Sequence, residues 1–293
     1  MAPSLGIVLW RASIRLMNIL QRIQARRHYR SRGYQVFRGA FSADEIEALA
    51  MMIRKQVVPY SGLILRMGDD VDFNRFHPGT GVVSNHLINP HRGLPSGLEA
   101  VSNALRRLIT SRALGDRLQA LDGEKHYTVH QTILFMSSPS TELHIDSWSL
   151  DTTPLGFSHT AWIPLQDMDP WSGVPSVVPW PRDSLLTEQD LGLPCIGTTA
   201  ERYERYQHAL STKVLGGGPE AITPLMRRGD FIVWSSLTPH FTLASRPLTV
   251  ERLALQVLIR PTRRIWGNFI AQPPKWTIDR SLKVTDQFSL YYV

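Results

Sequence analysis

The sequence predicts a mainly β protein with flanking helices and a core of two packed β-sheets. Apolar residues make up 43% of the 293-residue chain, which is enough for a buried core. Many short segments are alternating or apolar and are bounded by Gly, Pro, Ser or Asp, which is typical of a β-sandwich or barrel. The predicted strands cover residues 33–37, 126–136, 142–146, 157–165, 174–178, 230–235, 239–244 and 252–260.

Helices and long loops are expected around these strands. Ser42 and Glu45 have the spacing of a capping box, so a helix is predicted to begin there and to run to about Arg54. A second helical stretch is predicted over residues 97–121. Residues 60–95 are rich in Gly, Pro, Asn and His and are expected to form loops, where binding residues are disproportionately found.

The basic character of the chain belongs to its N-terminus. Eight arginines and no acid precede residue 42; the total of 32 Lys and Arg therefore leaves 24 for the rest, against 25 Asp and Glu. No nucleic-acid partner is expected, because such proteins more often carry the basic surface on the folded body. We expect a basic amphipathic helix over 1–32, then a single domain over 33–293 with an irregular insert at about 183–224.

Two interpretations of the N-terminal helix stay open. It could lie on an anionic membrane, where each Arg near the surface contributes about 1 kcal/mol, or pack on its own domain or a second subunit. Its apolar runs are too short for a membrane span or a signal peptide. With the single Cys195 no intrachain disulfide forms, and we expect a cytoplasmic protein or one at the inner face of the cytoplasmic membrane. The arginines on one face are 11, 15, 22 and 26.

The stretch TELHIDSW, residues 141–148, is a candidate metal site. His144 and Asp146 are two residues apart in a predicted strand, so their side chains share one face. A bare H-x-D motif is weak, and a third ligand is needed. His240 is favoured among the other histidines because a strand ends shortly before it, a turn follows, and His240 begins the next strand.

At this point the sequence resembles the Fe(II)/2-oxoglutarate dioxygenases, and most closely the phytanoyl-CoA dioxygenase (PhyH) group. The H-x-D motif, the distant His240 and Arg252 twelve residues further on follow the pattern of these enzymes. The segments at residues 33–49, 160–179 and 229–252 also resemble the group, with Trp180-Pro-Arg-Asp as a departure. The resemblance implies a double-stranded β-helix core, which is a jelly roll of the cupin-like type.

The resemblance also implies roles for particular residues. His144, Asp146 and His240 would be the catalytic iron ligands, and Gln131 and Arg252 would bind 2-oxoglutarate. Two His and one carboxylate leave three positions on Fe(II), two for the 2-oxo acid and one for O₂, and Arg suits the far carboxylate of the cosubstrate. Arg246 competes with Arg252 for this role. Asp146 favours a hydroxylase, because relatives that transfer halide lack the carboxylate.

The substrate is less constrained. Trp148 would lie on the face of the triad if its strand continues, and Trp234 ends the strand before His240. Cationic and amide groups in the loops suggest an anionic or polyhydroxylated substrate, either a small molecule or a lipid-linked sugar such as the Kdo sugar of bacterial lipid A. The loop candidates include Arg66, Arg75 and His86, with Asn74, Asn85 and Arg92 beside them.

Two functions of other classes use the same residues. A zinc hydrolase could activate a water on the His₂Asp triad, but it has no need of an arginine that clamps 2-oxoglutarate. A non-catalytic sugar- or lipid-binding β domain would not depend on Asp146. The sequence therefore predicts an Fe(II)/2-oxoglutarate-dependent hydroxylase first and these two alternatives second.

Overall fold

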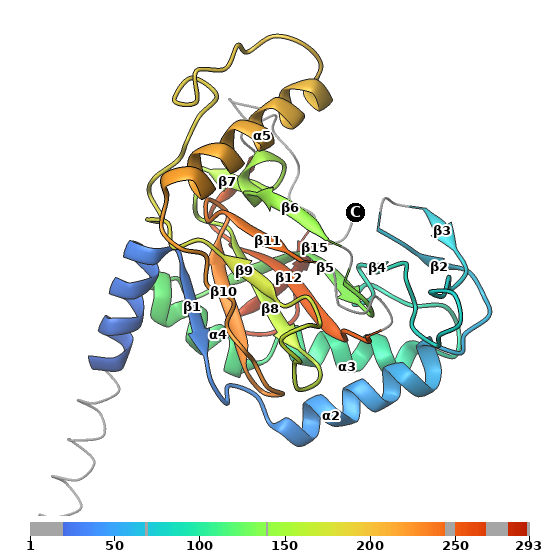
Figure 1. Cartoon of the computed structure of the whole chain (residues 1–293). Coiled ribbons are helices and arrows are strands. Elements are labelled where there is room, and N and C mark those ends of the chain that lie inside the picture. The colour runs from blue at the N-terminus through green and yellow to red at the C-terminus, as the bar shows by residue number, and fades with distance from the viewer. Residues whose placement is uncertain (1–19, 68–69, 139, 244–249, 268–280, 292–293) are drawn as a thin grey trace, which may run out of the picture.

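Two β-sheets of unequal size pack face to face in the computed structural model (Figure 1). The structure describes residues 20–67, 70–138, 140–243, 250–267 and 281–291. The large sheet has eight strands in the order β1-β10-β8-β12-β5-β15-β14, with β4 also paired to β5. The small sheet has the order β6-β11-β9. The prediction of a mainly β protein with a double-sheet core is confirmed.

The predicted strands are all present, with small differences at their ends. They are β1 (Tyr34–Phe37), β5 (Tyr127–Phe135), β6 (Thr141–His144), β8 (His159–Pro164), β9 (Pro175–Val177), β10 (Phe231–Ser235), β11 (His240–Thr242) and β12 (Ala254–Pro261). The strands that the sequence analysis did not predict are short or lie near the C-terminus: β2 (Ile64–Leu65), β3 (Val71–Asp72), β4 (Leu87–Ile88), β7 (Asp151–Thr153), β13 (Ile265–Gly267), β14 (Ser281–Lys283) and β15 (Phe288–Tyr291).

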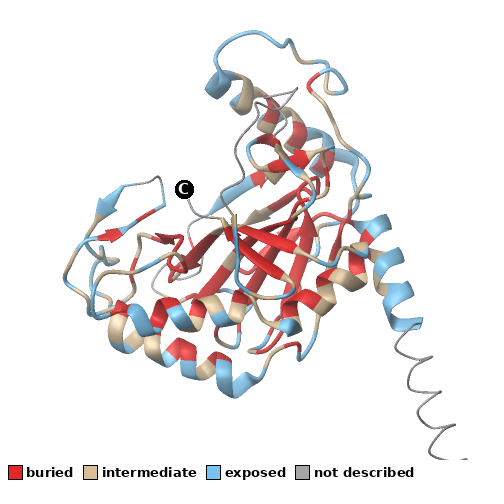
Figure 2. Cartoon of the chain, turned by 180° about the vertical axis from the view of Figure 1, so that it is seen from behind, coloured by how far each residue is buried: buried red, intermediate tan, exposed pale blue. Residues whose placement is uncertain are grey.

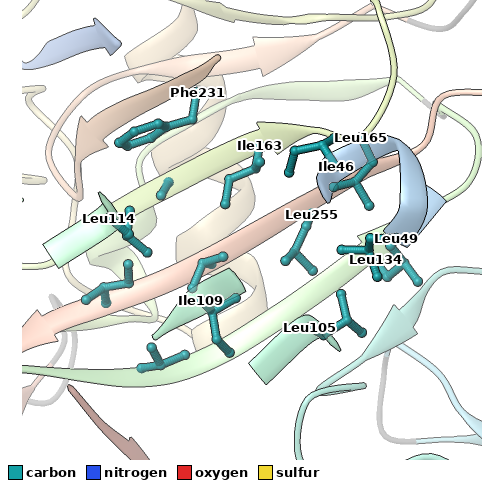
Figure 3. Close-up of a cluster of buried hydrophobic side chains, with 14 of the residues drawn as sticks. Ile46, Leu49, Leu105, Ile109, Leu114, Leu134, Ile163, Leu165, Phe231 and Leu255 are labelled. Carbon is teal, nitrogen blue, oxygen red and sulfur yellow. The ribbon is translucent and has the colours of Figure 1, made fainter. Parts of the chain in front are cut away.

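The central strand β8 shows how the large sheet divides its side chains. Successive strand residues point to opposite faces. Ile163 packs with Leu255 and Leu134 in the main core, on the face that the helices cover (Figure 3). Trp162 belongs to a second buried cluster that includes Val177 of the small sheet. The space between the two sheets is therefore lined by alternate residues of the large sheet.

Three helices cover the outer face of the large sheet, and the buried residues concentrate between them and the strands (Figure 2). Helix α2 (Ala43–Met52) begins after Ser42, whose side chain accepts a hydrogen bond from Glu45 N as predicted, and a π-helical turn (Ile53–Val57) extends it. The stretch predicted as one helix over 97–121 is two, α3 (Glu99–Ile109) and α4 (Arg112–Asp122). Ser111 separates them because it caps the start of α4.

The N-terminal helix is described from residue 20 to residue 32, and residues 1–19 lie outside the described part of the chain. Tyr29 is fully buried in the main core, and its hydroxyl lies 2.6 Å from His159 Nδ1. Within the described residues no helix is long and apolar enough to span a membrane. The division into residues 1–32 and 33–293 stays a prediction.

Two further segments flank the gap between the sheets. The predicted insert contains α5 (Thr199–Gly217), which begins with a capping box of Thr198 and Glu201 and packs on the small sheet through Tyr206, Leu210 and Val214. The loops of residues 60–95 include the β2–β3 hairpin and β4, which pairs with β5.

Candidate metal centre and adjoining cavity

The three predicted ligands meet at the edge of the small sheet. β6 ends at His144, and His240, the first residue of β11, is its partner in the antiparallel register. Asp146 Oδ1 lies 3.9 Å from His144 Nε2 and 3.6 Å from His240 Nε2. One ligand atom from each of the three residues fits within 4.8 Å of the others, which suits a shared metal ion.

The local backbone differs from the prediction at Asp146. The strand was expected to include residue 146, but it stops at His144, and Asp146 begins a 3₁₀ turn (Asp146–Trp148). Ile145 remains extended, with φ −119° and ψ 142°, so the two-residue alternation still carries His144 and Asp146 to the same side.

Backbone carbonyls fix both imidazoles. Nδ1 of His144 lies 2.8 Å from the carbonyl oxygen of Glu142, and Nδ1 of His240 lies 2.9 Å from that of Thr238. A carbonyl oxygen only accepts, so each Nδ1 donates its hydrogen and each Nε2 keeps its lone pair. Burial and the neighbouring His144 lower the pKa of His240 to about 4, which keeps this ring neutral.

Two side chains of the large sheet hold Asp146. Thr160 Oγ1 donates a hydrogen bond of 2.6 Å to Asp146 Oδ2, and Trp234 Nε1 donates another of 3.2 Å to the same oxygen. Thr160 and Trp234 are direct partners in the pairing of β8 with β10. The second oxygen, Oδ1, therefore faces the two imidazoles. Such contacts to metal ligands orient them and tune their affinity.

A cavity of about 150 Å³ adjoins the triad and extends toward Arg252. Its wall is mainly apolar, with Ile133, Phe135 and Trp162 from the large sheet and Phe241 from the small one. His144, His240, Arg252 and His86 are also in the wall. Two residues of the triad and a cationic side chain thus share one largely apolar cavity, which is the usual form of a small-molecule site.

Arg252 is 2% exposed and lies two residues before β12, not on the strand as predicted. Its Nη1 donates a hydrogen bond of 2.6 Å to the carbonyl oxygen of Gly173, and its guanidinium lies 4.8 Å from the centre of the Phe135 ring. Gly173 has a φ of +75°, and a side chain there would meet Ser138 Oγ at 2.1 Å, so only glycine brings this carbonyl into place.

The charge of Arg252 has no balancing acid within the part of the chain that the structure describes. Among the described residues no carboxylate forms an ion pair with it, and its Nε is buried without a hydrogen-bond partner. Burial lowers the pKa of Arg252 to about 9, so the side chain still carries its charge at neutral pH. Burying a cation without an anion beside it costs folding free energy. The competing Arg246 lies outside the described residues.

Of the other predicted residues, Trp234 and His86 lie at the cavity and Trp148 does not. Trp148 is 2% exposed and stacks against Tyr206 of α5 with ring centres 4.7 Å apart. The prediction that it faces the triad was wrong, because the strand gives way to the 3₁₀ turn and the ring joins the core beneath α5.

Arg66 and Arg75 are also away from the cavity wall. The guanidinium of Arg66 is buried among loop groups and donates to Asn74 Oδ1 and to the carbonyl oxygens of Asp72 and Asn85. Arg75 is exposed and pairs with Asp72 at 2.6 Å. One guanidinium therefore organises the loops from within and the other pairs with an acid in water, and a role of these two cations in substrate binding stays a prediction.

Gln131 lies near the site but outside the wall of the cavity. It is paired with Leu258, which is paired in turn with Thr160, so the register places Gln131 in the same row as the side chain that holds Asp146. Thr160 is not among the site residues predicted from the sequence. In a strand, Thr160 shares its face with Trp162, two residues further on, and this alternation is the signal that the sequence offers. Its contact with Asp146 becomes visible only when the pairing of β8 with β10 is known.

Two His and one carboxylate at the edge of a double-stranded β-helix define a mononuclear metal site of the kind used by non-haem iron enzymes. The sequence profile of the phytanoyl-CoA dioxygenase (PhyH) family matches residues 29–246. The match covers well over half of the chain, and the protein belongs to this family. No curated protein matches the sequence significantly.

Solved structures share the fold at low sequence identity. The epimerase SnoN, in complex with Fe³⁺, α-ketoglutarate and nogalamycin RO, is 17% identical with a TM-score of 0.58, over 89% of this chain and 93% of its own. The carbocyclase SnoK from nogalamycin biosynthesis is 19% identical with a TM-score of 0.56, over 86% and 88%. EctD from S. alaskensis with bound Fe is 16% identical with a TM-score of 0.54, over 84% and 79%. The jelly-roll prediction is confirmed.

Proposed function

We propose that the protein is an Fe(II)- and 2-oxoglutarate-dependent oxygenase in which His144, Asp146 and His240 hold the iron. Family membership and the gathering of the three ligand atoms support this role. The donor set also fits, because imidazole and carboxylate are the ligands of the facial triad of such enzymes. The structural neighbours SnoN and EctD were solved with iron and with 2-oxoglutarate (α-ketoglutarate).

The observation that carries the proposal is the buried charge of Arg252, which has no ion-pair partner among the described residues and lies in the wall of the cavity that His144 and His240 also line. The far carboxylate of 2-oxoglutarate is an anion of suitable size, and Arg binds carboxylates through two parallel hydrogen bonds. A zinc hydrolase has no use for this cation, and a non-catalytic binding domain has no use for three converging metal ligands. Arg252 is therefore proposed as the cosubstrate clamp, with Gln131 as a nearby second contact.

The side chains of the site have separate tasks in this reaction. Bound iron, with 2-oxoglutarate and O₂, supplies the oxidising power, and the 2-oxo acid leaves as succinate and CO₂. The carbonyl contacts of Nδ1 leave Nε2 of His144 and of His240 to face the metal, while Thr160 and Trp234 hold Oδ2 of Asp146 and leave Oδ1 turned toward the imidazoles. The aromatic wall of Phe135, Trp162 and Phe241 excludes water from the reacting groups.

Hydroxylation of a C–H bond is the proposed outcome, because Asp146 occupies the place that a halide needs. An anionic or polyhydroxylated substrate, including a lipid-linked sugar such as Kdo, is the substrate proposed from the sequence. Among the loop residues proposed for the substrate, His86 lies in the cavity wall, whereas Arg66 and Arg75 have their partners in the loops.

A cytoplasmic protein with a peripheral membrane contact is proposed from the N-terminal helix. Arg22, Arg26, Arg27 and Arg30 are exposed, and so are Leu20 and Ile23. The inner side of the same helix carries Tyr29 and Ala25 against the main core. In Figure 1 this helix lies at the opposite end of the molecule from the β2–β3 hairpin, so a membrane held by the helix would leave the loops of residues 60–95 away from it.

Anaerobic binding of Fe(II) and 2-oxoglutarate tests the proposed function. Chelation of ferrous iron by a 2-oxo acid gives a weak visible absorption band, which we expect for the purified protein. Asp146→Ala should abolish the band, because it removes a ligand. Glu142→Ala is the matched control, because it removes an exposed carboxylate from β6, four residues before Asp146, but keeps the carbonyl that holds His144. A folded wild-type protein without the band would overturn the proposal.

A further inference from the structure

His86 occupies the wall of the cavity next to Arg252. It is 8% exposed, and its ring meets the edge of the Phe135 ring with centres 4.7 Å apart. The guanidinium of Arg252 lies 4.8 Å from the centre of the same Phe135 ring. Two side chains that are distant in sequence therefore flank one aromatic ring and face one enclosure.

Both ring nitrogens of His86 are buried without a hydrogen-bond partner among the described residues. Burial and the charge of Arg252 lower the pKa of His86 to about 4, so the imidazole is neutral and offers one donor and one acceptor. Leaving both unsatisfied costs folding free energy. The contrast is His159, which is also buried and uses both nitrogens, one toward Tyr29 and one toward Asp122.

The backbone of His86 is held on both sides, although its side chain has no polar partner in the described part of the chain. The next two residues form β4 and pair with Leu134 and Ile133 of β5. The carbonyl oxygen of His86 accepts a hydrogen bond from Met67 N, in the turn between β2 and β3. A fixed main chain and a side chain whose hydrogen-bonding nitrogens lack partners are together expected of a residue that binds a ligand.

We propose that His86 donates a hydrogen bond to the far carboxylate of 2-oxoglutarate beside Arg252, and so helps the site select 2-oxo acids that carry a second carboxylate. This inference rests on the proposed function. A carboxylate has acceptor sites for both the guanidinium and an imidazole N–H. Arg252 would supply the charge and donate hydrogen bonds from its guanidinium, and His86 would donate a further hydrogen bond that fixes the orientation of the carboxylate.

The test compares two 2-oxo acids of equal chain length in the anaerobic Fe(II) protein. 2-Oxoglutarate has the far carboxylate, and 2-oxovalerate has a methyl group in its place. For His86→Phe, which keeps a flat ring without polar atoms, the dissociation constant of 2-oxoglutarate should rise about tenfold, the effect of one hydrogen bond to a charged group. That of 2-oxovalerate should stay unchanged. His86→Gln, which restores an N–H donor, should recover part of the loss.

His208→Phe is the control, because His208 is exposed on α5. Equal weakening of both acids in His86→Phe would indicate a disturbed cavity and would overturn the inference. An unchanged 2-oxoglutarate constant would also overturn it, and would assign His86 to the primary substrate. Absence of the band from the wild-type protein with either acid is a different result, because it removes the proposed function itself.

Discussion

The two ends of the cavity are built in opposite ways. At the triad, each side chain is held by a second group: His144 and His240 by carbonyl oxygens, and Asp146 by Thr160 and Trp234. At the other end, Arg252 Nε and both nitrogens of His86 have no partner among the described residues. The protein thus completes the metal end by itself, and we infer that it leaves the other end for a ligand to complete.

The largest effect on the difference between the two ends of the cavity is expected from a substitution of Arg252. Arg252→Met keeps the length of the side chain and removes the buried charge, so we expect 2-oxoglutarate to bind roughly 100-fold more weakly, the equivalent of two hydrogen bonds to a charged group. The free energy of unfolding of the ligand-free protein should stay the same or rise by about 1 kcal/mol, because an unpaired buried ion is replaced by an apolar group. Titration of the visible band and thermal unfolding measure the two effects.

Arg260→Met is the matched control. Arg260 is similarly buried near the end of β12, where its Nη1 donates hydrogen bonds to the carbonyl oxygens of Thr262 and Arg264, but it is not in the cavity wall. This variant should lose stability and bind 2-oxoglutarate as the wild type does. If Arg252→Met were the less stable of the two, Arg252 would be a structural residue and the contrast between the two ends would be lost.

A smaller effect is expected from loosening the metal end. Thr160→Val removes the hydroxyl that donates to Asp146 Oδ2 at 2.6 Å and keeps the shape of the side chain. We expect Fe(II) affinity to fall about 10- to 100-fold, which is typical of groups that orient a metal ligand. Competition with a chromogenic chelator under anaerobic conditions measures the change.

Thr128→Val controls for the loss of a buried hydroxyl. Thr128 lies on β5 and shares a hydrogen bond with Thr262. Its variant should keep the iron affinity of the wild type. Similar losses in both variants would mean that Thr160 acts only through the general stability of the sheet.

The smallest functional effect is expected at Tyr29. Tyr29→Phe removes the hydroxyl that lies 2.6 Å from His159 Nδ1 in the main core, and should cost about 1 to 2 kcal/mol of unfolding free energy. Iron and 2-oxoglutarate binding should be unchanged, because the contact lies on the helix-covered side of the sheet. Chemical denaturation followed by tryptophan fluorescence measures the loss of stability. A changed iron affinity would contradict the prediction that the helix-covered face of the large sheet does not affect the metal site on its other face.

The sequence predicts the triad better than its surroundings for a physical reason. His144 and Asp146 are related by a two-residue period that survives the end of β6, because Ile145 remains extended. Trp148 is two residues further on, where the chain has turned, and the same period fails. The contact of Thr160 with Asp146 depends on which strands are neighbours, and one sequence carries no direct record of strand order.

The loops of residues 60–95 show which features of a segment its composition does not predict. Their composition correctly indicates irregular structure, but it cannot tell a cation that faces a cavity from one that ties a loop together. Arg66 satisfies its guanidinium within the loops, whereas His86, twenty residues later, has unsatisfied nitrogens in the cavity wall. Only the groups that surround each side chain in the folded protein distinguish Arg66 from His86.

Strand β8 carries Thr160 on the face of the metal site and His159 on the opposite face, where it bonds both Asp122 and Tyr29. Anyone who prepares a shortened version of this protein should therefore begin it well before Tyr29 and not at residue 33, where the first strand suggests a natural start. A version that lacked this tyrosine would expose a buried acid–imidazole pair directly behind the residue that steadies Asp146, and poor iron retention in it would be an artefact of the cut.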